Sequence, residues 1–348
     1  MQKADALLTT TPGSVVEKTI LLPGGDIHDY LSLAPYWWPD PTKPDGLPYI
    51  QKDGQTNPEV NSIPDKNNFN KMASAVSTLG FAYYFTNDEK YAAKATEFLR
   101  VWFLNKDTYM NPNLNHAQVI KGIDTGRGIG IIDVRGFADV IDGIGCIERS
   151  HAWTEQDQKG LQSWFSQYLD WLLHSPNGKD EAATVNNHAS WYDLQAASIA
   201  FFAQDTALAR SIIEAVKTKR IQVQIQPDGS QPLELSRTLS WHYSVFNLQP
   251  LYTLAMMGNH VGVDLWDYQT TSGASLRKAL EYVLPAAFNP PVWPYQQISA
   301  LKPGELVDVL YQAAIHYHST TYLQDAQQIL GLDAATHIDN LLYGYQVV

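Results

Sequence analysis

Apolar residues recur at helical spacing along most of the chain after Asn67. Residues 67–87 and 88–105 both carry this spacing and are separated by a short polar turn, which predicts an antiparallel helical hairpin. The same pattern predicts two more hairpins, over residues 126–150 with 154–175 and over residues 187–202 with 206–221. Further helices are predicted at residues 233–258, ending at Gly258, and at 274–284, 305–317 and 322–330.

Helix starts and non-helical stretches complete this picture. Thr154 and Asp157 stand at capping-box spacing where a helix is predicted to begin. Residues 23–66 are dense in Pro, Gly, Asp and Asn, which favour turns over helices. Alternation typical of strands is scarce, and the one clear case, "IQVQIQPDG", also fits the end of a helix. We therefore expect an all-α fold in a single structural domain, with an irregular segment 1–66 packed on a helical domain 67–348.

The composition is that of a globular protein with an excess of acidic groups. Apolar residues make up 45% of the chain and charged residues 17%, which excludes a disordered chain. The net charge is −12, from 24 basic and 36 acidic residues, and this argues against a nucleic-acid partner. A polyanionic ligand would need a locally basic groove, because the field of the whole protein repels it. The 10 Trp and 19 Tyr residues suit sugar stacking as well as core packing.

Two further classes of protein are disfavoured by the sequence. No apolar run reaches the length of about 18 residues that a membrane-spanning helix requires. The lone Cys146 excludes an internal disulfide and a cysteine-rich metal site. Residues 1–19 lack the apolar core of a signal peptide, so we expect either a cytosolic protein or an exported one whose leader has been removed.

Residues 184–202, "TVNNHASWYDLQAASIAFF", place three polar side chains at the start of an otherwise apolar helix. In a helix beginning near Asn187, helical spacing groups the following residues on the core face: Trp191, Leu194, Ser198 and Phe201. A second face carries His188, Tyr192 and Gln195. The residues alone leave two interpretations open. Either Asn186 or Asn187 caps the helix and His188 is an ordinary histidine, or the three form a site that binds a carboxylate and moves a proton.

A second group of chemically capable residues follows the turn signal Pro227-Asp228-Gly229, and consists of Glu234, Arg237, His242 and Tyr243. Arg237 and Tyr243 are six residues apart, about 120° around an ideal helix. They therefore share a face only if Arg237 lies at an irregular helix entrance or its long side chain bends round. The alternative is that Arg237 pairs with Glu234 and the aromatic residues belong to the core.

A third group lies in "NPNLNHAQVIKGIDTGRGIGIIDVRGF" and is rich in hydrogen-bond donors. Its members are Asn113, Asn115, His116, Gln118, Lys121, Arg127 and Arg135. The stretch "GRGIG" is not a phosphate loop, because no strand is predicted before it and the Walker lysine is missing. The donor-rich stretch is either a binding surface or a long solvated loop.

Metal and glycosidase chemistry have weaker support. There is no HExxH motif, and His316 and His318 fall on opposite sides of a helix, so we predict no metal site and no cofactor. A hydrolase would need two partnered carboxylates. Four carboxylates could serve, namely Asp124, Asp133, Asp193 and Glu234, but no spacing marks two of them as partners.

Several of these motifs together resemble the alginate-lyase-type polysaccharide lyases. They are "HDYLSLAPYWWPDP", "NPEVNSIPDKNNFNKMASAVSTLGFAYYF", "MNPNLNHAQ", "GRGIGIID", "VNNHASWYD" and "SRTLSWHYSVFNLQ". The resemblance runs in order over roughly residues 28–345 and is nearest to polysaccharide lyase family 38, with family 5 as a more distant relative. It implies an α/α toroid, an incomplete barrel of about six to seven helical hairpins. It also implies metal-independent β-elimination by a periplasmic or secreted enzyme.

The resemblance also implies the roles of individual residues. It maps Asn187, His188 and Arg237 onto the groups that neutralise a uronate carboxylate, and Tyr243 onto the tyrosine that moves protons; His188 as the base is a variant. We expect substrate contacts from the following residues: Asn115, His116, Gln118, Arg127, Trp191, Tyr192, Glu234 and His242. The implied substrate is mannuronate-rich alginate, with glucuronan as the alternative. An α/α-toroid glycoside hydrolase and a polysaccharide-binding module are the rival functions.

Overall fold

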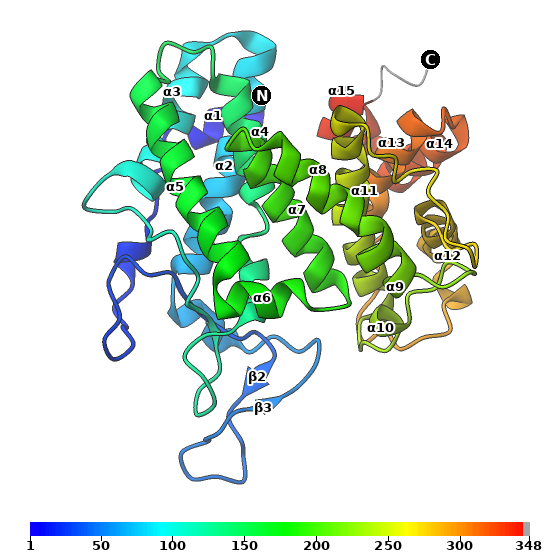
Figure 1. The fold of residues 1–348 in the computed structure, drawn as a ribbon, viewed down its shortest axis with the longest axis horizontal. Helices are drawn as coiled ribbons and strands as arrows, with labels where there is room; N and C mark the ends of the chain where they lie inside the picture. Colours follow the sequence, from blue (N-terminus) through cyan, green and yellow to red (C-terminus); the bar gives the residue numbers. More distant parts are fainter. Residues whose placement is uncertain (344–348) are drawn as a thin grey trace. The chain divides into compact units, whose positions relative to one another are not determined.

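Helices make up most of the computed structural model, which describes residues 1–343 (Figure 1). The chain forms two compact units. The first comprises residues 1–183 with 198–205, and the second comprises residues 184–197 with the chain from Thr206 onward. The helix α7, Asn187–Phe202, therefore contributes residues to both. The predicted all-α class is confirmed.

The N-terminal segment is largely irregular, as predicted. Its short strands form two small pairs: β1 (Leu31–Leu33) runs parallel to β4 (His116–Val119), and β2 (Trp37–Trp38) runs antiparallel to β3 (Ile50–Gln51). Two 3₁₀ helices, Val15–Glu17 and Pro58–Ser62, interrupt it. The helix α1, Gln2–Leu7, was not predicted, because six residues are too few to display a helical repeat.

Asp65, the first residue of α2, fixes this segment to the helices. Its buried carboxylate accepts a hydrogen bond of 2.9 Å from the backbone N–H of Leu31, the first residue of β1. The ammonium of Lys18 lies 3.0 Å from the same oxygen, and both charged side chains are almost completely buried. A buried charge is tolerated only when it is paired and hydrogen-bonded, so these contacts hold the irregular chain on α2.

The first unit is built from five longer helices. These are α2 (Asp65–Thr86), α3 (Glu89–Leu99), α4 (Phe137–Ile147), α5 (Glu155–His174) and α6 (Pro176–Ala182). A π-helical turn, Arg100–Leu104, extends α3. The hairpin of α2 and α3 is confirmed, with Asn87 in the left-handed conformation and the side chain of Asp88 accepting from the N–H of Lys90 at the turn.

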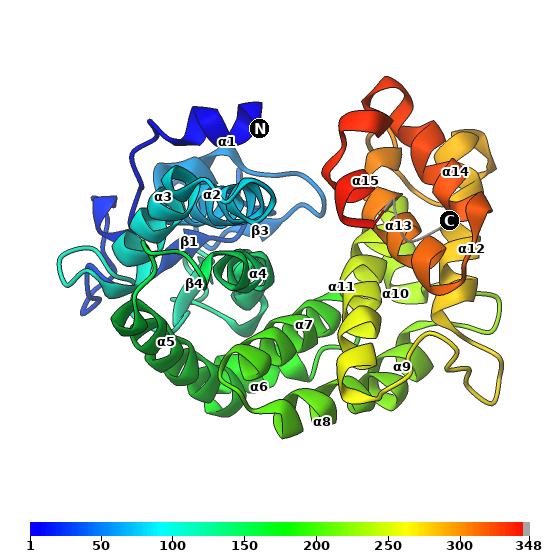
Figure 2. The same ribbon diagram turned by 90° about the horizontal axis from the view of Figure 1, so that it is seen from above.

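The predicted hairpin of α4 with α5 was wrong, because α4 packs mainly against α2 (Figure 2). The contact is close: a Cβ atom added at Gly80 would lie 2.7 Å from the carbonyl oxygen of Gly143. Only glycine lets the two backbones approach this far. Helix α4 also begins later than predicted, since residues 128–134 form a 3₁₀ helix, Gly128–Val134.

Aromatic rings fill the core of the first unit. The ring of Phe137 lies 5.1 to 5.6 Å from those of Phe69, Trp164, Phe165 and Tyr168, mostly edge to face. This is the preferred arrangement of aromatic pairs. Helix α5 starts with the predicted capping box, in which Thr154 and Asp157 satisfy each other's backbone N–H groups.

The second unit contains the remaining helices. They are α8 (Thr206–Val216), α9 (Gln222–Gln224), α10 (Pro232–Leu235), α11 (Ser240–Val261), α12 (Leu276–Phe288), α13 (Val307–His316), α14 (Thr320–Leu330) and α15 (Ile338–Tyr343). A π-helical turn, Lys217–Ile221, joins α8 to α9, and 3₁₀ helices lie at Pro290–Val292, Pro303–Leu306 and Gly331–Thr336. Helix α11 packs against α8, α10, α12 and α13 and forms the centre of this unit (Figure 2).

The single long helix predicted over residues 233–258 is in fact two helices. A turn over residues 236–239 separates α10 from α11. At its other end α11 continues past Gly258 and stops at Gly262, whose φ of 67° closes the helix with a left-handed residue. Gly258 marks a close approach instead, since a Cβ atom there would lie 2.4 Å from the carbonyl oxygen of Val263.

Candidate active site

Asn186 caps the N-terminus of α7. Its side-chain oxygen accepts a hydrogen bond of 3.2 Å from the N–H of His188, and its carbonyl oxygen accepts from the N–H of Ala189. These are the bonds expected of an N-cap asparagine. The cap interpretation therefore holds for Asn186, which leaves Asn187 and His188 in the first turn of the helix.

The carboxylate of Glu234 binds the next residue, Asn187, through both oxygens. The backbone N–H of Asn187 donates to Oε1 at 2.7 Å, and the side-chain Nδ2 donates to Oε2 at 2.8 Å. Asn187 is fully buried and Glu234 is 1% exposed. Burial raises the pKa of Glu234 above its usual range, against the opposing effects of the two bonds from Asn187 and the charges of Arg237 and His188. Glu234 was predicted to contact substrate, but both of its carboxylate oxygens are bonded to Asn187.

Arg237 lies in the turn between α10 and α11, outside both helices. Its guanidinium carbon is 3.6 Å from the centroid of the Tyr243 ring. The 120° separation expected of one continuous helix does not apply, because the chain is not helical at residues 236–239. The structure therefore brings together the arginine and the tyrosine that spacing alone left apart.

Aromatic rings from α7 and α11 continue from Tyr243. His242 stacks on Phe246 with ring centroids 5.6 Å apart and planes within 17°, and Phe246 lies 5.0 Å from Trp191. All three rings are half-buried, so they present part of their surface to solvent. Trp191 was predicted to lie on the core face and also to contact substrate, and its side chain is half-buried.

Glu305 fixes the orientation of His242. The imidazole Nδ1–H donates to Oε2 of Glu305 at 2.7 Å, and the 3₁₀ helix that carries Glu305 is held in turn by Gln249, whose Nε2 donates to the Glu305 carbonyl oxygen. The bond at Nδ1 fixes the orientation of the imidazole ring, whose centroid lies 5.1 Å from that of the Tyr243 ring. This pair was not predicted from the sequence, because its members are 63 residues apart.

A buried chain of amides joins the start of α7 to α11. Nδ2 of Asn247 donates to Oε1 of Gln224 at 2.8 Å and to Oε1 of Gln231 at 2.7 Å. Oε1 of Gln224 also accepts a hydrogen bond from the hydroxyl of Ser190, and its Nε2 donates to the carbonyl oxygen of Asn186. These side chains are at most 5% exposed apart from Asn186. These hydrogen bonds tie the cap of α7 to the helix that carries Tyr243.

Helix α7 does not have the two distinct faces that its sequence suggested. Tyr192 and Gln195, expected on a polar face, are buried, as are Leu194 and Ser198. A helix that is apolar nearly all round is buried nearly all round. Its one charged residue, Asp193, is paired bidentately with Arg220 at 2.7 and 3.0 Å, which the sequence did not predict.

In the first unit, the buried carboxylate of Asp133 is the centre of a hydrogen-bond network that includes Gln118 of the donor-rich stretch. It accepts hydrogen bonds from Ser32 at 2.6 Å, from Lys66 at 2.7 Å and from Gln118 at 2.8 Å. Burial alone would raise the pKa of Asp133, but the charge of Lys66 and these bonds bring it below its usual range. Arg127 donates to the other end of the Gln118 side chain at 2.9 Å. Gln118 and Arg127, predicted as substrate contacts, therefore belong to one network.

Asn115 and His116 lie beside this network at the start of β4. Asn115 is exposed, and its Oδ1 accepts a hydrogen bond of 2.9 Å from Nε1 of Trp171. His116 is bonded through Nδ1 to the carbonyl oxygen of Thr125. Gln118 itself has a φ of 52°, an uncommon conformation for a residue other than glycine. Residues 116–119 of the donor-rich stretch form a strand, and the side chains of Asn115 and His116 are held by hydrogen bonds.

The four candidate carboxylates of a hydrolase are all occupied. Asp133 and Asp193 pair with Lys66 and Arg220, and Glu234 binds Asn187, as described above. Asp124 shapes its own loop by accepting from the N–H groups of Ile120 and Gly126. None of them stands as a pair of acid and base around an open position.

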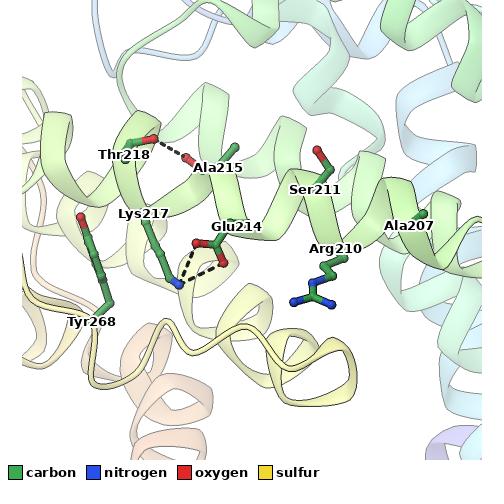
Figure 3. A pocket seen from close by; sticks show the side chains of 8 residues that line it. All are labelled: Ala207, Arg210, Ser211, Glu214, Ala215, Lys217, Thr218 and Tyr268. Atoms are coloured by element: carbon green, nitrogen blue, oxygen red, sulfur yellow. Dashed lines mark hydrogen bonds and ion pairs between the residues drawn. The ribbon is translucent and has the colours of Figure 1, made fainter.

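A separate shallow hollow of about 720 Å³ lies along α8 in the second unit (Figure 3). Arg210, Glu214 and Lys217 extend from the same side of the helix, and Tyr268 lies beside Lys217. Lys217 donates to both oxygens of Glu214 at 2.9 and 3.0 Å. The hollow contains none of the predicted catalytic residues, so the candidate active site does not coincide with it.

Residues 1–343 contain neither a cluster of metal ligands nor a membrane-spanning helix. In that range no three His, Cys, Asp or Glu side chains gather in an arrangement that could hold a metal ion. Nor does any helix there combine the length and the apolar character needed to cross a bilayer. The "GRGIG" stretch forms the start of a 3₁₀ helix, Gly128–Val134, and no phosphate loop.

Comparison with known proteins places this geometry in context. The sequence profile of the family described as alginate lyase matches residues 14–293. A crystal structure of an alginate lyase from Bacteroides ovatus is 41% identical, covers 98% of this chain and 91% of its own, and superposes with a TM-score of 0.94. A comparison with curated proteins finds no match.

More distant solved structures share the fold. Alginate lyase A1-III from Sphingomonas species A1 is 16% identical, covers 92% of this chain and 88% of its own, and has a TM-score of 0.60. A variant of A1-III with alanine in place of one histidine, complexed with a tetrasaccharide, matches with the same identity and TM-score over 92% and 87% of the two chains. These likenesses confirm the predicted fold class, that of the α/α-toroid lyases.

Proposed function

The chain belongs to the alginate lyase family, and on this premise we propose that it cleaves mannuronate-rich alginate by β-elimination without a metal ion. The family supports polysaccharide lyase activity. The observation that carries the proposal is the guanidinium of Arg237, 3.6 Å from the ring centroid of Tyr243, within the unit that also contains His188 and Asn187.

The reaction removes the C5 proton of a uronate and expels the C4 oxygen. The C5 proton is weakly acidic, because the neighbouring carboxylate resists further negative charge. A lyase must first neutralise that carboxylate, and donors aimed at the developing charge contribute most. Arg237 supplies a fixed positive charge, protonated His188 supplies charge and a hydrogen bond, and Asn187 has an amide donor.

Tyr243 is proposed to move the protons. A phenol ordinarily titrates near about 10, so a tyrosine base needs a cation nearby. The guanidinium over its ring meets this need. On mannuronate the C5 proton and the C4 oxygen lie on the same side of the ring, so one tyrosine can remove the proton and return it to the leaving oxygen. His188 as the base, with Tyr243 as the acid, is the variant to be tested.

We propose that a second group of residues contacts sugars of the polymer other than the one at which the reaction takes place. Asn115, His116, Gln118 and Arg127 form an ordered, donor-rich surface in the first unit. Trp191, Tyr192 and His242 are the proposed contacts in the second unit, and the half-buried rings of Trp191 and His242 suit stacking on sugars. A net charge of −12 repels a polyanion, so binding must depend on such local donors.

The proposed substrate has one close alternative. Glucuronan carries the same relation between the C5 proton and the leaving oxygen, so the same tyrosine could act on it. The tetrasaccharide complex of A1-III shows that a related fold holds an oligosaccharide. A polymer too large to enter a cell is met outside the cytoplasm, and we therefore propose that the enzyme works in the periplasm or as a secreted protein.

One experiment separates the lyase from its rivals. The protein is incubated with polymannuronate, polyguluronate and glucuronan, and the ultraviolet absorbance of an unsaturated product is followed together with the release of reducing ends. A lyase produces both signals. A glycoside hydrolase produces reducing ends without the absorbance, and a binding module produces neither, so either result would refute the proposal.

A further inference from the structure

Glu234 occupies the N-terminus of α7, the place where an anionic substrate group was expected. Its Oε1 accepts the first-turn N–H of Asn187 at 2.7 Å, and its Oε2 accepts Nδ2 of the same residue at 2.8 Å. A carboxylate suits this position, because the helix dipole and the unpaired N–H groups favour negative charge there. Glu234 is itself buried, and both of its oxygens already accept hydrogen bonds from Asn187.

The two bonds fix the direction of the Asn187 amide. The oxygen and nitrogen ends of an asparagine side chain have nearly the same shape, so packing alone does not choose between them. An ionised carboxylate can only accept hydrogen bonds, and it therefore requires Nδ2 of Asn187 to face it. A glutamine at position 234 could face either end of the amide and would lose this selection.

Glu234 also connects Asn187 to the turn that carries the arginine. Its carbonyl oxygen accepts the N–H of Arg237 at 3.1 Å, and α10, which contains Glu234, packs against α11. The positive charges facing its carboxylate are those of Arg237 and, when protonated, His188. One buried side chain is thus in contact with, or electrostatically coupled to, three of the four proposed catalytic groups.

We propose that Glu234 is a positioning residue, which binds one N–H of the Asn187 amide so that the second N–H of Nδ2 donates to the substrate carboxylate, and which takes no direct part in the chemistry. This role rests on the function proposed above, because it assumes that Asn187 acts on the substrate. It predicts that loss of Glu234 lowers kcat more than it raises KM, and that the loss acts through Asn187.

The test compares Glu234→Gln, Glu234→Asp and Asn187→Ala with the double variant of Glu234→Gln and Asn187→Ala. Glu234→Gln should lower kcat about 10- to 100-fold, the usual effect of removing a supporting partner, and change KM less than about threefold. Glu234→Asp keeps the charge and both acceptors, and should recover part of the loss. In the Asn187→Ala background, Glu234→Gln should change kcat by less than about twofold, since effects transmitted through one residue are not additive.

Glu214→Gln is the matched control. Glu214 is an exposed residue of α8 in the same unit, and it pairs with Lys217 of the adjoining π-helical turn. Its loss should therefore leave kcat and KM unchanged. Circular dichroism in the near ultraviolet checks that every variant is folded. If Glu234→Gln does not fold, Glu234→Asp carries the same comparison in the wild-type and Asn187→Ala backgrounds.

Several outcomes would overturn the positioning role. They are an unchanged kcat in folded Glu234→Gln, a loss of thermal stability alone, and full multiplication of the two effects in the double variant. Failure of the proposed function looks different. In that case Asn187→Ala alone keeps the wild-type kcat, or the wild-type protein forms no unsaturated product from any polyuronate.

Discussion

The guanidinium of Arg237 lies over the face of the Tyr243 ring, 3.6 Å from its centroid. A cation in this position favours the ring when it carries negative charge, and the interaction strengthens as water is excluded. Tyr243 is 6% exposed, so solvent screens the pair only weakly. In the mechanism proposed above, this arrangement supplies the charge assistance that a phenol needs to serve as a base near neutral pH.

Replacing Arg237 with lysine should therefore impair catalysis although the charge is kept. Lysine lacks the planar guanidinium that stacks on an aromatic face. We expect kcat to fall about 10- to 100-fold and the pH of half-maximal rate to move upward, since the phenol then loses its proton less readily. Initial rates measured across pH test this. Arg210→Lys, at an exposed arginine of the same unit, is the control, and an unshifted pH profile in Arg237→Lys would argue against the assistance.

Tyr243→Phe removes only the hydroxyl and should abolish most of the turnover. General acid and base groups contribute about 10²- to 10⁴-fold in rate, and a tyrosine that serves twice should lie at the upper end. Binding of an oligouronate, measured by calorimetry, should stay within about twofold of wild type because the ring remains. Tyr252→Phe, on the same helix but bonded to the carbonyl oxygen of Leu276, should lose some stability and no activity. Near-normal turnover of Tyr243→Phe would exclude the tyrosine as the proton carrier.

Features set by neighbouring residues could be predicted from the sequence. The capping box of Thr154 and Asp157 and the cap at Asn186 both depend on groups at most three residues apart, and both are present. The hairpin of α2 and α3 follows from its apolar repeat and short turn. The break before α11 was missed, because residues 236–239 carry no glycine or proline to interrupt the helical pattern.

Contacts between distant residues were beyond such reasoning. Asn187 and Glu234 are 47 residues apart, and His242 and Glu305 are 63 apart. The motif resemblance supplied the proposed catalytic residues, yet it could not tell that the anion at the start of α7 belongs to the protein itself. Only the fold shows which carboxylates are already hydrogen-bonded or ion-paired within the protein.

Asp157 should stabilise the first unit in a pH-dependent way. Burial would raise its pKa, but hydrogen bonds from Arg100 and Thr154 and the charge of Arg100 lower the pKa to about 2. A lowered pKa stabilises the fold fully above the ordinary value of about 4, and the contribution is lost as the pH falls towards 2. Asp157→Asn should cost about 1 to 2 kcal/mol at pH 7, allowing for the half-exposed arginine.

Thermal unfolding of both proteins between pH 7 and pH 2 measures this contribution. The difference in Tm should be largest at neutral pH and much smaller near pH 2, where about half of the wild-type carboxylate is protonated too. Asp170→Asn, at an exposed carboxylate on the same helix, should show little difference at any pH. A Tm difference for Asp157→Asn that persists unchanged at pH 2 would assign the effect to packing instead of charge.

Removal of divalent metals should leave the lyase rate unchanged. In the proposed mechanism, Arg237 and His188 supply the positive charge that a calcium ion would bring to the substrate carboxylate. Initial rates are compared before and after exhaustive chelation and again after calcium is added back. A loss of activity that calcium restores would show that the residues alone do not neutralise the carboxylate.

The preferred substrate should be a β-linked polyuronate in which the C5 proton is syn to the leaving oxygen. Polymannuronate and glucuronan meet this condition, whereas polyguluronate requires a base on the opposite face of the ring. We expect the highest initial rate on polymannuronate and a weak rate on polyguluronate.

Binding should depend on local cationic or donor groups, namely Arg127, Arg135, Arg237 and His116. Moderate salt should then maintain or raise the rate, because it screens the repulsion between the polymer and a protein of net charge −12. Rates on the three homopolymers at two ionic strengths measure both effects. A clear preference for polyguluronate would contradict the tyrosine-centred syn mechanism and favour His188 as an opposing base.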